Sequence, residues 1–473
     1  DLNYVQPTAG NPTYGAILEG VAVGRFGAIS SSALVRDDPR AAPQTIRTDT
    51  YWRRDFPGRM ETLVVGDTIS RGGAWSRPVR YAGIRYGRDF SLAPGYLTYP
   101  LPTIRGSAAL PSTVDVLVNN HRRQGGVKVG PGAFELTDVP VITGAGEVNL
   151  VVRDLLGVER VISQSYYLSP RLLAQGVSDF AFEAGALRMD YGLRSNNYGD
   201  GFAAAAYRYG LTNAVTVEGR AELAHTRQAA GLEVTTRVSQ LGSLRAAAAY
   251  SKAQEDGRTA SRGGRYLVSF ERSGPGGGGS ITWEQLDRGF RQLGSLPGEA
   301  LPRRRIQAAA GLSLGGYASV GLSYISQDTW EGDDFALASL TFSTSLPSDF
   351  RLGAYASTDL QRGGWSGGLT LSRPLGTRRS FSAASSRTRD GRLTNLVQAS
   401  QSPPVGPGLG WRVQASDRES QLLLAGATLN TDQGQFTAEA NLSRDGSANA
   451  IRLGANGAVG WTARSAVMRK PCG

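Results

Sequence analysis

Cysteine, histidine and long apolar runs are all scarce in this chain of 473 residues. The single cysteine, Cys472, cannot form an intrachain disulfide or a zinc site. The two histidines, His121 and His225, have no serine, cysteine or carboxylate motif at informative spacing, so a solvated turn explains each better than catalysis. Helical periodicity is nearly absent and no segment has the apolar length of a membrane helix. These absences argue against a disulfide scaffold, an enzyme and an α-helical membrane protein.

Two further patterns resemble ligand sites but lack the residues that such sites need. The acidic pairs Asp37-Asp38 and Asp333-Asp334 have no regular third and fourth ligand, so acidic loops explain them better than calcium binding. The glycine-rich stretch from Gly274 to Gly279 lacks the lysine and the helix of a phosphate loop and predicts a flexible turn. We therefore predict no catalytic residue, no cofactor and no metal.

The charge is strongly positive, with 51 basic and 40 acidic residues and a formal net charge of +11. Such a balance can indicate nucleic-acid binding. Here the arginines are spread through turns and polar strand faces instead of clustering on one element with interleaved aromatic residues. A cationic water-filled lumen and charged loops explain the charge better, so we predict no nucleic-acid partner.

The dominant pattern is alternation between apolar and polar residues in segments of roughly ten residues, repeated about eighteen times between Phe202 and Trp461. From Val215 to Leu223 the odd positions are apolar or small, and the even positions are Thr216, Glu218, Arg220 and Glu222. Successive strand residues point to opposite faces, so one face suits lipid and the other suits water. This pattern is typical of a transmembrane β-barrel, which closes the edges that so many strands would expose.

Composition agrees with strands that need only every second residue apolar. The chain has 62 glycines, 40% hydrophobic residues and a mean hydropathy of −0.25, which is unusual for a globular core. Acidic residues on the polar strand faces lie opposite many arginines and predict ion-pair ladders in the lumen. They are Glu183, Glu218, Glu222, Glu233 and Glu439.

The chain divides into three parts. Residues 1–100 contain about six strand candidates, and residues 169–473 resume the long alternating strands. Between them, residues 101–168 contain about six shorter strands rich in β-branched residues, which predict a small β-sandwich with its own core. At roughly 17 residues per repeat the two outer parts give about two dozen strands, and a barrel of that width leaves an aqueous channel. The sandwich is therefore a candidate plug, and Phe134 is a candidate anchor of its core.

A family resemblance rests on motifs that occur in order over more than a hundred residues. They are Gly66-Asp67-Thr68-Ile69-Ser70, Trp75-Ser76, Val79-Arg80-Tyr81-Ala82-Gly83-Ile84, Pro111-Ser112-Thr113-Val114-Asp115-Val116-Leu117-Val118-Asn119, Gly130-Pro131-Gly132-Ala133-Phe134-Glu135-Leu136, Gly144-Ala145-Gly146-Glu147-Val148 and Val151-Val152-Arg153-Asp154. Together they resemble the fimbrial outer-membrane ushers of the chaperone–usher pathway. The resemblance implies a twenty-four-stranded pore with an immunoglobulin-like plug inserted after the sixth strand, in the outer membrane of a Gram-negative bacterium.

The resemblance also implies gating segments and partners. Arg71 to Ser76, which include Trp75, fall where ushers have a hairpin that folds inward over the plug, although an ordinary hairpin tip remains an alternative. Asp287 to Arg305 break the alternation, and Phe290, Leu293 and Leu296 could form a short amphipathic helix that caps the plug, or an extracellular loop. The implied partners are periplasmic chaperone–pilin subunit complexes, pilus subunits in the lumen and outer-membrane lipid, with a homodimer as an open alternative.

The chain also departs from the family pattern. It opens at Asp1 without a cleavable signal peptide and stops after Cys472-Gly473, which predicts a middle fragment of a longer precursor that lacks the periplasmic N- and C-terminal domains. Such a fragment is expected to keep the pore and gate but not initial substrate capture. Competing hypotheses are a diffusion porin, a plugged transporter, and a soluble all-β adhesin or polysaccharide-binding enzyme.

Overall fold

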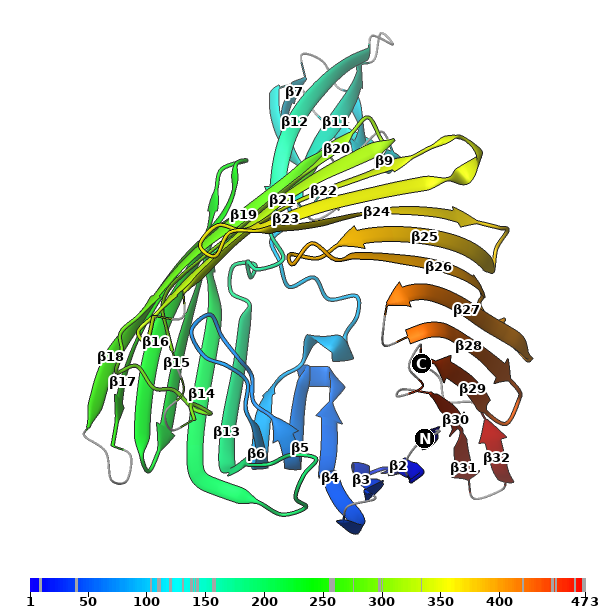
Figure 1. Ribbon diagram of the computed structural model, residues 1–473. Helices are drawn as coiled ribbons and strands as arrows, with labels where there is room; N and C mark the ends of the chain where they lie inside the picture. Colours follow the sequence, from blue (N-terminus) through cyan, green and yellow to red (C-terminus); the bar gives the residue numbers. More distant parts are fainter. Residues whose placement is uncertain are drawn as a thin grey trace.

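The protein is all-β, and its main body is one closed antiparallel sheet of 24 strands (Figure 1). This confirms the predicted barrel of about two dozen strands. The computed structural model describes residues 1–7, 11–38, 41–102, 104–108, 112–118, 121–129, 132–136, 139, 141, 144–154, 159–254, 260–274, 276–296, 299, 301–332, 334–418, 421–443, 446, 449–462 and 465–469.

The barrel strands run in chain order around the ring. They are β1 (Leu2–Pro7), β2 (Thr13–Gly24), β3 (Gly27–Asp38), β4 (Ala41–Phe56), β5 (Glu61–Ile69), β6 (Arg80–Arg88), β13 (Ser178–Arg188), β14 (Tyr198–Thr212), β15 (Val215–Ala224), β16 (Arg227–Val238), β17 (Gly242–Ala253), β18 (Ser261–Arg272), β19 (Gly277–Leu286), β20 (Pro302–Leu314), β21 (Ala318–Thr329), β22 (Phe335–Ser345), β23 (Arg351–Asp359), β24 (Trp365–Pro374), β25 (Arg379–Arg387), β26 (Leu393–Gln401), β27 (Gly408–Arg418), β28 (Gln421–Asn430), β29 (Gln435–Leu442) and β30 (Ala450–Asn456).

Two pairings close this ring. The first strand, β1, pairs with β30, from Leu2 opposite Ala455 to Pro7 opposite Ala450. Strand β6 pairs directly with β13 although the chain makes a long excursion between them. Closure satisfies the backbone groups of both edge strands, as a membrane interior requires.

The two faces of the wall have opposite characters, and β15 shows this most clearly. Its polar residues Thr216, Arg220 and Glu222 are only 2–4% exposed, whereas Leu223 on the other face is 55% exposed. A soluble protein would bury the leucine. The alternation therefore places apolar side chains on the outer, lipid-facing surface and polar ones on the lumen side, as predicted.

The excursion between β6 and β13 carries six shorter strands that belong to separate sheets. They are β7 (Ile104–Ala108), β8 (Ser112–Val118), β9 (His121–Val129), β10 (Gly132–Leu136), β11 (Gly144–Asp154) and β12 (Glu159–Leu168). One sheet has the order β12-β11-β8-β9, and β10 pairs with β7 in the other. We call these six strands the sandwich. Its core includes Val114, Val116, Val148 and Leu150, none of which is exposed.

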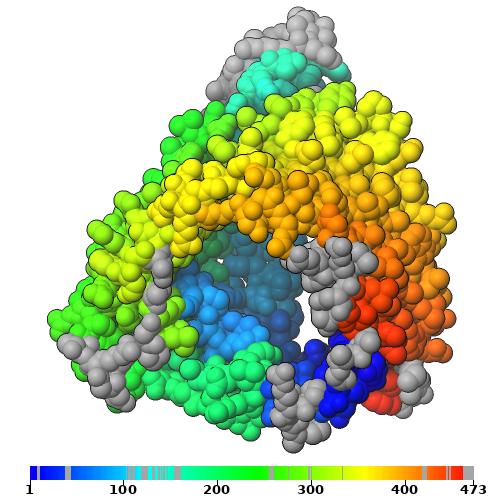
Figure 2. Space-filling model, in the orientation of Figure 1, coloured from blue at the N-terminus to red at the C-terminus, as the bar shows by residue number. Residues whose placement is uncertain are grey.

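The sandwich lies outside the ring of barrel strands, beyond the ends of β16 to β20 (Figures 1 and 2). It does not fill the lumen in this conformation, and the space-filling view shows a hollow at the centre of the barrel (Figure 2).

The remaining regular elements among the described residues are few. Three 3-10 turns, η1 (Pro57–Arg59), η2 (Phe90–Leu92) and η3 (Pro347–Asp349), lie in connections. A terminal hairpin of β31 (Ala458–Thr462) and β32 (Ser465–Arg469) forms its own sheet. The last barrel strand therefore ends at Asn456, although the alternating pattern was expected to continue to Trp461. Within the described residues no helix is long and apolar enough to cross a membrane.

Candidate functional site

The hairpin between β5 and β6, residues 70–79, folds into the lumen. Trp75 at its tip is 2% exposed and packs with Ala229, Ala249, Leu286 and Phe290. An ordinary exposed tip would not bury a tryptophan, so the hairpin folds inward, and its role in gating stays a prediction. The hairpin packs on the barrel wall and not on the sandwich, which lies elsewhere.

A glycine in the wall makes room for this tryptophan. A Cβ atom at Gly231 of β16 would lie 2.6 Å from the indole Nε1 of Trp75 and 2.6 Å from the Cβ atom of Ala249. Side chains essentially never approach so closely, so the indole rests in a recess that only glycine leaves open.

Arg71 fixes the first arm of the hairpin to the same wall. Its backbone N–H donates to the carboxylate of Glu183 at 2.7 Å, and its guanidinium lies 2.6 Å from the carboxylate of Asp179. Both acceptors belong to β13, the strand that follows the sandwich. The arginine therefore joins the hairpin to the strand at which the chain re-enters the barrel.

The connection between β19 and β20 also folds inward. Phe290 and Leu293 are 1% and 2% exposed, and the backbone N–H of Leu293 donates to Glu222 at 3.1 Å. The expected short helix is absent from the described residues of this connection, so that interpretation was wrong. Gly294 adopts a φ of +73°, which ends any helical turn, and the backbone N–H groups of Arg291 and Leu293 donate to the wall residues Ser251 and Glu222 instead.

The two inward segments are joined to each other. Both guanidinium nitrogens of Arg77 donate to Glu299, at 2.9 and 2.7 Å, and Val79 packs against Leu293. The hydrogen bond from Arg77 holds the pKa of the Glu299 carboxyl below its usual range, despite partial burial. The hairpin and the connection therefore form one unit inside the barrel.

The predicted ion-pair ladders are present on the lumen face. Arg220, itself 1% exposed in its side chain, lies 2.9 Å from Glu222 and 3.6 Å from Glu183. Arg245 donates to both oxygens of Glu233, at 2.6 and 2.8 Å. Further pairs join Arg208 to Glu218, Arg265 and Arg305 to Glu284, and Arg412 and Arg452 to Glu439.

The sequence did not reveal a second buried cluster, centred on Asp67. Its carboxylate accepts hydrogen bonds from Arg188 at 2.6 Å, from Tyr198 at 3.0 Å and from the backbone N–H of Thr50 at 2.9 Å, and it also contacts Arg47. Asp67 lies within one of the family motifs, and Thr50 and Arg47 come from the neighbouring strand β4, but Arg188 and Tyr198 lie more than a hundred residues away, so no local spacing could identify the cluster.

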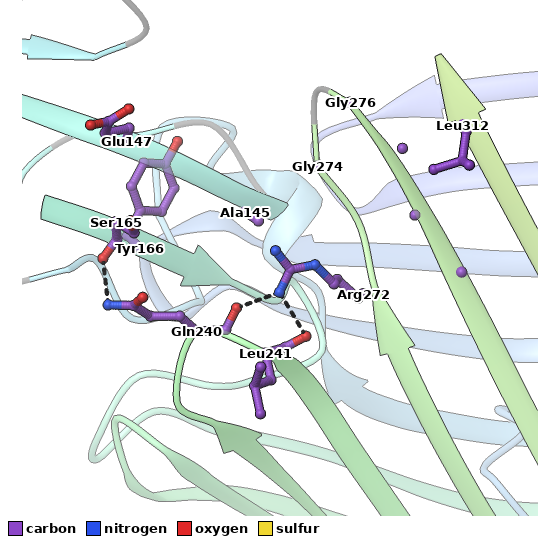
Figure 3. Close-up of a pocket in the computed structure, with 13 residues that line it drawn as sticks. Ala145, Glu147, Ser165, Tyr166, Gln240, Leu241, Arg272, Gly274, Gly276 and Leu312 are labelled. Atoms are coloured by element: carbon purple, nitrogen blue, oxygen red, sulfur yellow. Dashed lines mark hydrogen bonds between the residues drawn. The ribbon is translucent and has the colours of Figure 1, made fainter. Parts of the chain in front are cut away.

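The sandwich contacts the barrel at two adjacent turns (Figure 3). The backbone N–H of Ala145 donates to the carbonyl of Ser273 at 2.6 Å, and the amide of Gln240 donates to the carbonyl of Ser165 at 3.1 Å. Arg272 donates to the carbonyls of Gln240 and Leu241 in the same turn (Figure 3). A cleft of 840 Å³ remains between the sandwich and the glycine-rich turn that follows Arg272. We call the two barrel turns that make this contact, at Gln240 and at Ser273, the docking turns.

Glu271 reinforces the junction where the sandwich leads back to the barrel. Its carboxylate accepts from Ser243 at 3.2 Å and from Ser169 at 3.5 Å, and pairs with Arg171 at 3.1 Å. Its carbonyl accepts from the hydroxyl of Tyr167 at 3.3 Å. One residue at the end of β18 therefore holds the last strand of the sandwich and the segment that follows it.

The other candidate residues lie outside the two inward segments. Phe134 is half-buried against the sandwich core, far from the lumen segments. His121 begins β9 instead of lying in a turn, whereas His225 lies between β15 and β16 as expected. Among the described residues no three side chains of the metal-binding types come together, and Asp333 lies outside the described residues.

Fold and site together define a large transmembrane β-barrel pore with inward-folded segments and an inserted sandwich. A family model described as "Outer membrane usher protein" matches residues 25–473. The chain therefore belongs to the outer membrane usher family, and its apolar outer face fits the Gram-negative outer membrane.

Individual relatives are distant. The chain is 24% identical over 225 residues to the outer membrane usher protein YehB of Escherichia coli (strain K12), which covers 47% of this chain and 26% of that protein. It is 22% identical over 333 residues to the F1 capsule-anchoring protein of Yersinia pestis, covering 67% of this chain and 39% of the relative. These matches span well under half of either relative.

Two solved structures share the fold. The translocation pore of the P pilus usher PapC aligns over 96% of this chain and 97% of that chain, with a TM-score of 0.60 and 17% identity. A chain of the Escherichia coli P pilus tip assembly intermediate PapC-PapD-PapK-PapG aligns over all of this chain and 62% of that chain, with a TM-score of 0.77 and 17% identity.

Proposed function

We propose that this chain forms the pore through which an usher secretes pilus subunits across the outer membrane and assembles them. Its substrates are subunits delivered by a periplasmic chaperone. Family membership supports this function, and the solved intermediate of the same fold is described as a pilus tip assembly containing PapC, PapD, PapK and PapG. Secretion and assembly involve no covalent chemistry. Outer-membrane lipid surrounds the barrel, and two copies of the protein could pair as a homodimer.

One observation carries the gating part of this proposal: the sandwich is inserted between two strands that pair with each other. Because β6 and β13 pair directly, the barrel closes whether or not the sandwich is inside it. The sandwich can therefore move as a unit about its two ends. We assign residues 101–168 to a plug domain, residues 1–100 and 169–473 to the barrel, and this conformation to the open state of the gate.

The inward segments complete the gate. Arg71, Trp75, Phe290 and Leu293 narrow the lumen from one side and are each fixed to the wall by burial or ion pairs. The segments that carry them, and not the buried side chains themselves, would contact a plug that returns to the lumen. Phe134 acts inside the plug, where it stabilises the core that keeps the domain folded during movement.

Deletion of residues 107–164, bridged by a short glycine-serine linker, tests the gate in planar bilayers. The wild-type pore should alternate between closed and open currents, whereas the deletion variant should insert normally and stay open. Removal of residues 71–76 should raise the conductance by a smaller amount. Closures that persist unchanged in the deletion variant would show that the sandwich is not the gate.

A diffusion porin or plugged transporter is the alternative function. A transporter plug precedes its barrel, whereas this sandwich interrupts the barrel after its sixth strand. Secretion of a folded subunit from a purified chaperone–subunit complex, by the full-length protein in proteoliposomes, separates the two. A porin would pass small solutes but no subunit.

A further inference from the structure

The lumen wall changes character between β20 and β21. On β13 to β19 the lumen face carries the arginine–glutamate pairs. Arg305 of β20 lies on the same face and donates two hydrogen bonds to Gln327 of β21, at 3.0 and 2.8 Å. Beyond that point, serine and threonine are the commonest residues on the lumen face through β26, where Leu337 and Tyr355, 38% and 45% exposed, also face the lumen. We call this surface the hydroxyl wall and mark it by one residue on each strand: Ser323, Ser339, Ser357, Thr370, Ser382 and Ser400.

The strand register shows that these residues share one face. Ser323 lies opposite Ser339, and Ser339 lies opposite Ser357. On the outer face of the same strands, Leu340 and Leu369 are 49% and 57% exposed, as lipid-facing residues are. The six strands are described throughout, and the charged side chains on their lumen face are Arg351 and Asp359, at opposite ends of β23.

Three cross-strand pairs join hydroxyl groups of this wall. Ser339 donates to Ser357 at 3.0 Å, and further cross-strand pairs join Ser319 to Ser343 at 2.8 Å and Ser380 to Ser400 at 3.0 Å. In each pair one hydroxyl donates its hydrogen and the other keeps its own, which exchanges readily with water. The wall therefore presents a largely uncharged polar surface, with Tyr355 as an exposed aromatic side chain among the hydroxyls.

Strands β13 to β19 are less accessible from the lumen. The hairpin at residues 70–79 and the connection after β19 cover β13 to β19 from within, where Trp75, Phe290 and Leu293 are buried. The hollow of the barrel opens beside the yellow and orange strands, which include the hydroxyl wall (Figure 2). A body that crosses the lumen must therefore pass on the side away from β13 to β19, which includes the hydroxyl wall.

We propose that the hydroxyl wall is the surface along which a folded secreted protein moves through the pore. This inference rests on the proposed secretion function. Tight protein interfaces depend on a few aromatic or arginine anchors in desolvated pockets, and serine and threonine rarely serve as such anchors. A wall of mostly small hydroxyl side chains leaves a passing domain hydrated and binds it weakly. A charged wall would instead bind surface patches of opposite charge on that domain. The partner is a folded domain that contacts the wall through changing parts of its surface.

Site-specific photo-crosslinking in the full-length protein tests this path. A benzoylphenylalanine placed at Ser357 or Ser382 should crosslink to a subunit arrested in transit. The matched control is Thr437, which also faces the lumen and is exposed but lies beyond the wall in β29, beside the Glu439 ion pairs. Leu369 on the lipid face is the background control. Crosslinking from Thr437 as strong as that from Ser357 would overturn the proposal.

Substitutions provide an independent test. Ser357→Arg with Ser382→Arg should slow subunit secretion several-fold, whereas Ser357→Ala with Ser382→Ala and the single control Thr437→Arg should leave it near the wild-type rate. Unchanged ion conductance will show that each barrel is intact. Wild-type secretion by the double arginine variant would refute the hydroxyl wall as the path. Absence of secretion by the wild type itself would instead refute the proposed function.

Discussion

Arg77 and Glu299, which lie 222 residues apart, form a two-pronged ion pair that joins the two inward segments of the barrel. Each prong is a hydrogen bond below 3.0 Å, and the backbone N–H of Leu296 donates to the same carboxylate at 3.1 Å. The pair lies in connections outside the membrane-spanning strands. Protonation of Glu299, or substitution of either residue, is therefore expected to separate one inward segment from the other.

The first prediction concerns acid. Because Arg77 lowers the pKa of Glu299, the contribution of this pair to the ordered connection is fully present above the ordinary glutamate pKa of about 4.3 and is lost as the pH falls through the lower, folded value. A spin label at Leu296→Cys, in a Cys472→Ser background, should become mobile only below that range. With Glu299→Gln it should be mobile already at pH 7, and Arg77→Lys should be intermediate. A label equally immobile in Glu299→Gln would contradict the junction.

The second prediction contrasts two neighbours at the centre of β22. Leu340 faces lipid and is 49% exposed, whereas Thr341 faces the lumen. Leu340→Arg should destabilise the folded barrel by about 2–4 kcal/mol and Thr341→Arg by about 1 kcal/mol or less, because only the first places a charge in hydrocarbon. Reversible unfolding from lipid vesicles measures both. Equal losses would contradict the assignment of faces.

The same comparison cannot be made at Thr216, which the alternation alone would suggest as an open lumen position. Thr216 is 2% exposed and its hydroxyl accepts a hydrogen bond from the backbone N–H of Leu173 at 2.8 Å. An arginine there would disturb packing for reasons unrelated to lipid, so β22 gives the cleaner pair.

The third prediction uses the docking turns. A Cβ atom at Gly274 would lie 3.2 Å from the Cβ atom of Ala145, near the spacing of about 3.5–4.5 Å that a disulfide needs. Ala145→Cys with Gly274→Cys, in a Cys472→Ser background, should therefore oxidise readily and hold the pore open until a reductant is added. Gly276→Cys is the matched control, because a Cβ atom there has no neighbour within 4 Å. A crosslinked pore that still closes would show that docking and opening are unrelated.

The fourth prediction is that residues 101–168 fold in isolation. Leu150 is fully buried in the sandwich, so Leu150→Ala should lower the free energy of unfolding by about 2–5 kcal/mol. Phe134→Ala should cost about 3 kcal/mol, since that ring is only partly buried. Val161→Ala, at a side chain that is 62% exposed, is the control and should change little. Absence of a cooperative transition in the isolated segment would contradict an independent domain.

Much of the fold could be predicted because strand alternation is a local property. The polar and apolar positions of β15 are visible in the sequence, and the ion pair between Arg245 and Glu233 follows from two polar faces in register. The inward position of Trp75 was one of two alternatives, since nothing near it in the chain reveals the recess at Gly231.

Other features depend on contacts that no local pattern records. The cluster of Asp67 with Arg188 and the pair of Arg77 with Glu299 each join distant strands. Phe290 and Leu293 have helical spacing, yet tertiary hydrogen bonds to Glu222 and Ser251 take the backbone donors that a helix would use. The docked position of the sandwich likewise depends on a turn more than a hundred residues away.

The direct pairing of β6 with β13 has a consequence for how this architecture can change over evolutionary time. The 89 residues between Arg88 and Ser178 form one closed loop on an otherwise continuous ring. Loop-closure entropy grows only logarithmically, so lengthening a five-residue turn to this size, about four doublings, costs about 2.5 kcal/mol. Barrel stability is therefore nearly indifferent to what the loop contains, and selection can replace or redesign the inserted module without redesigning the wall that carries it.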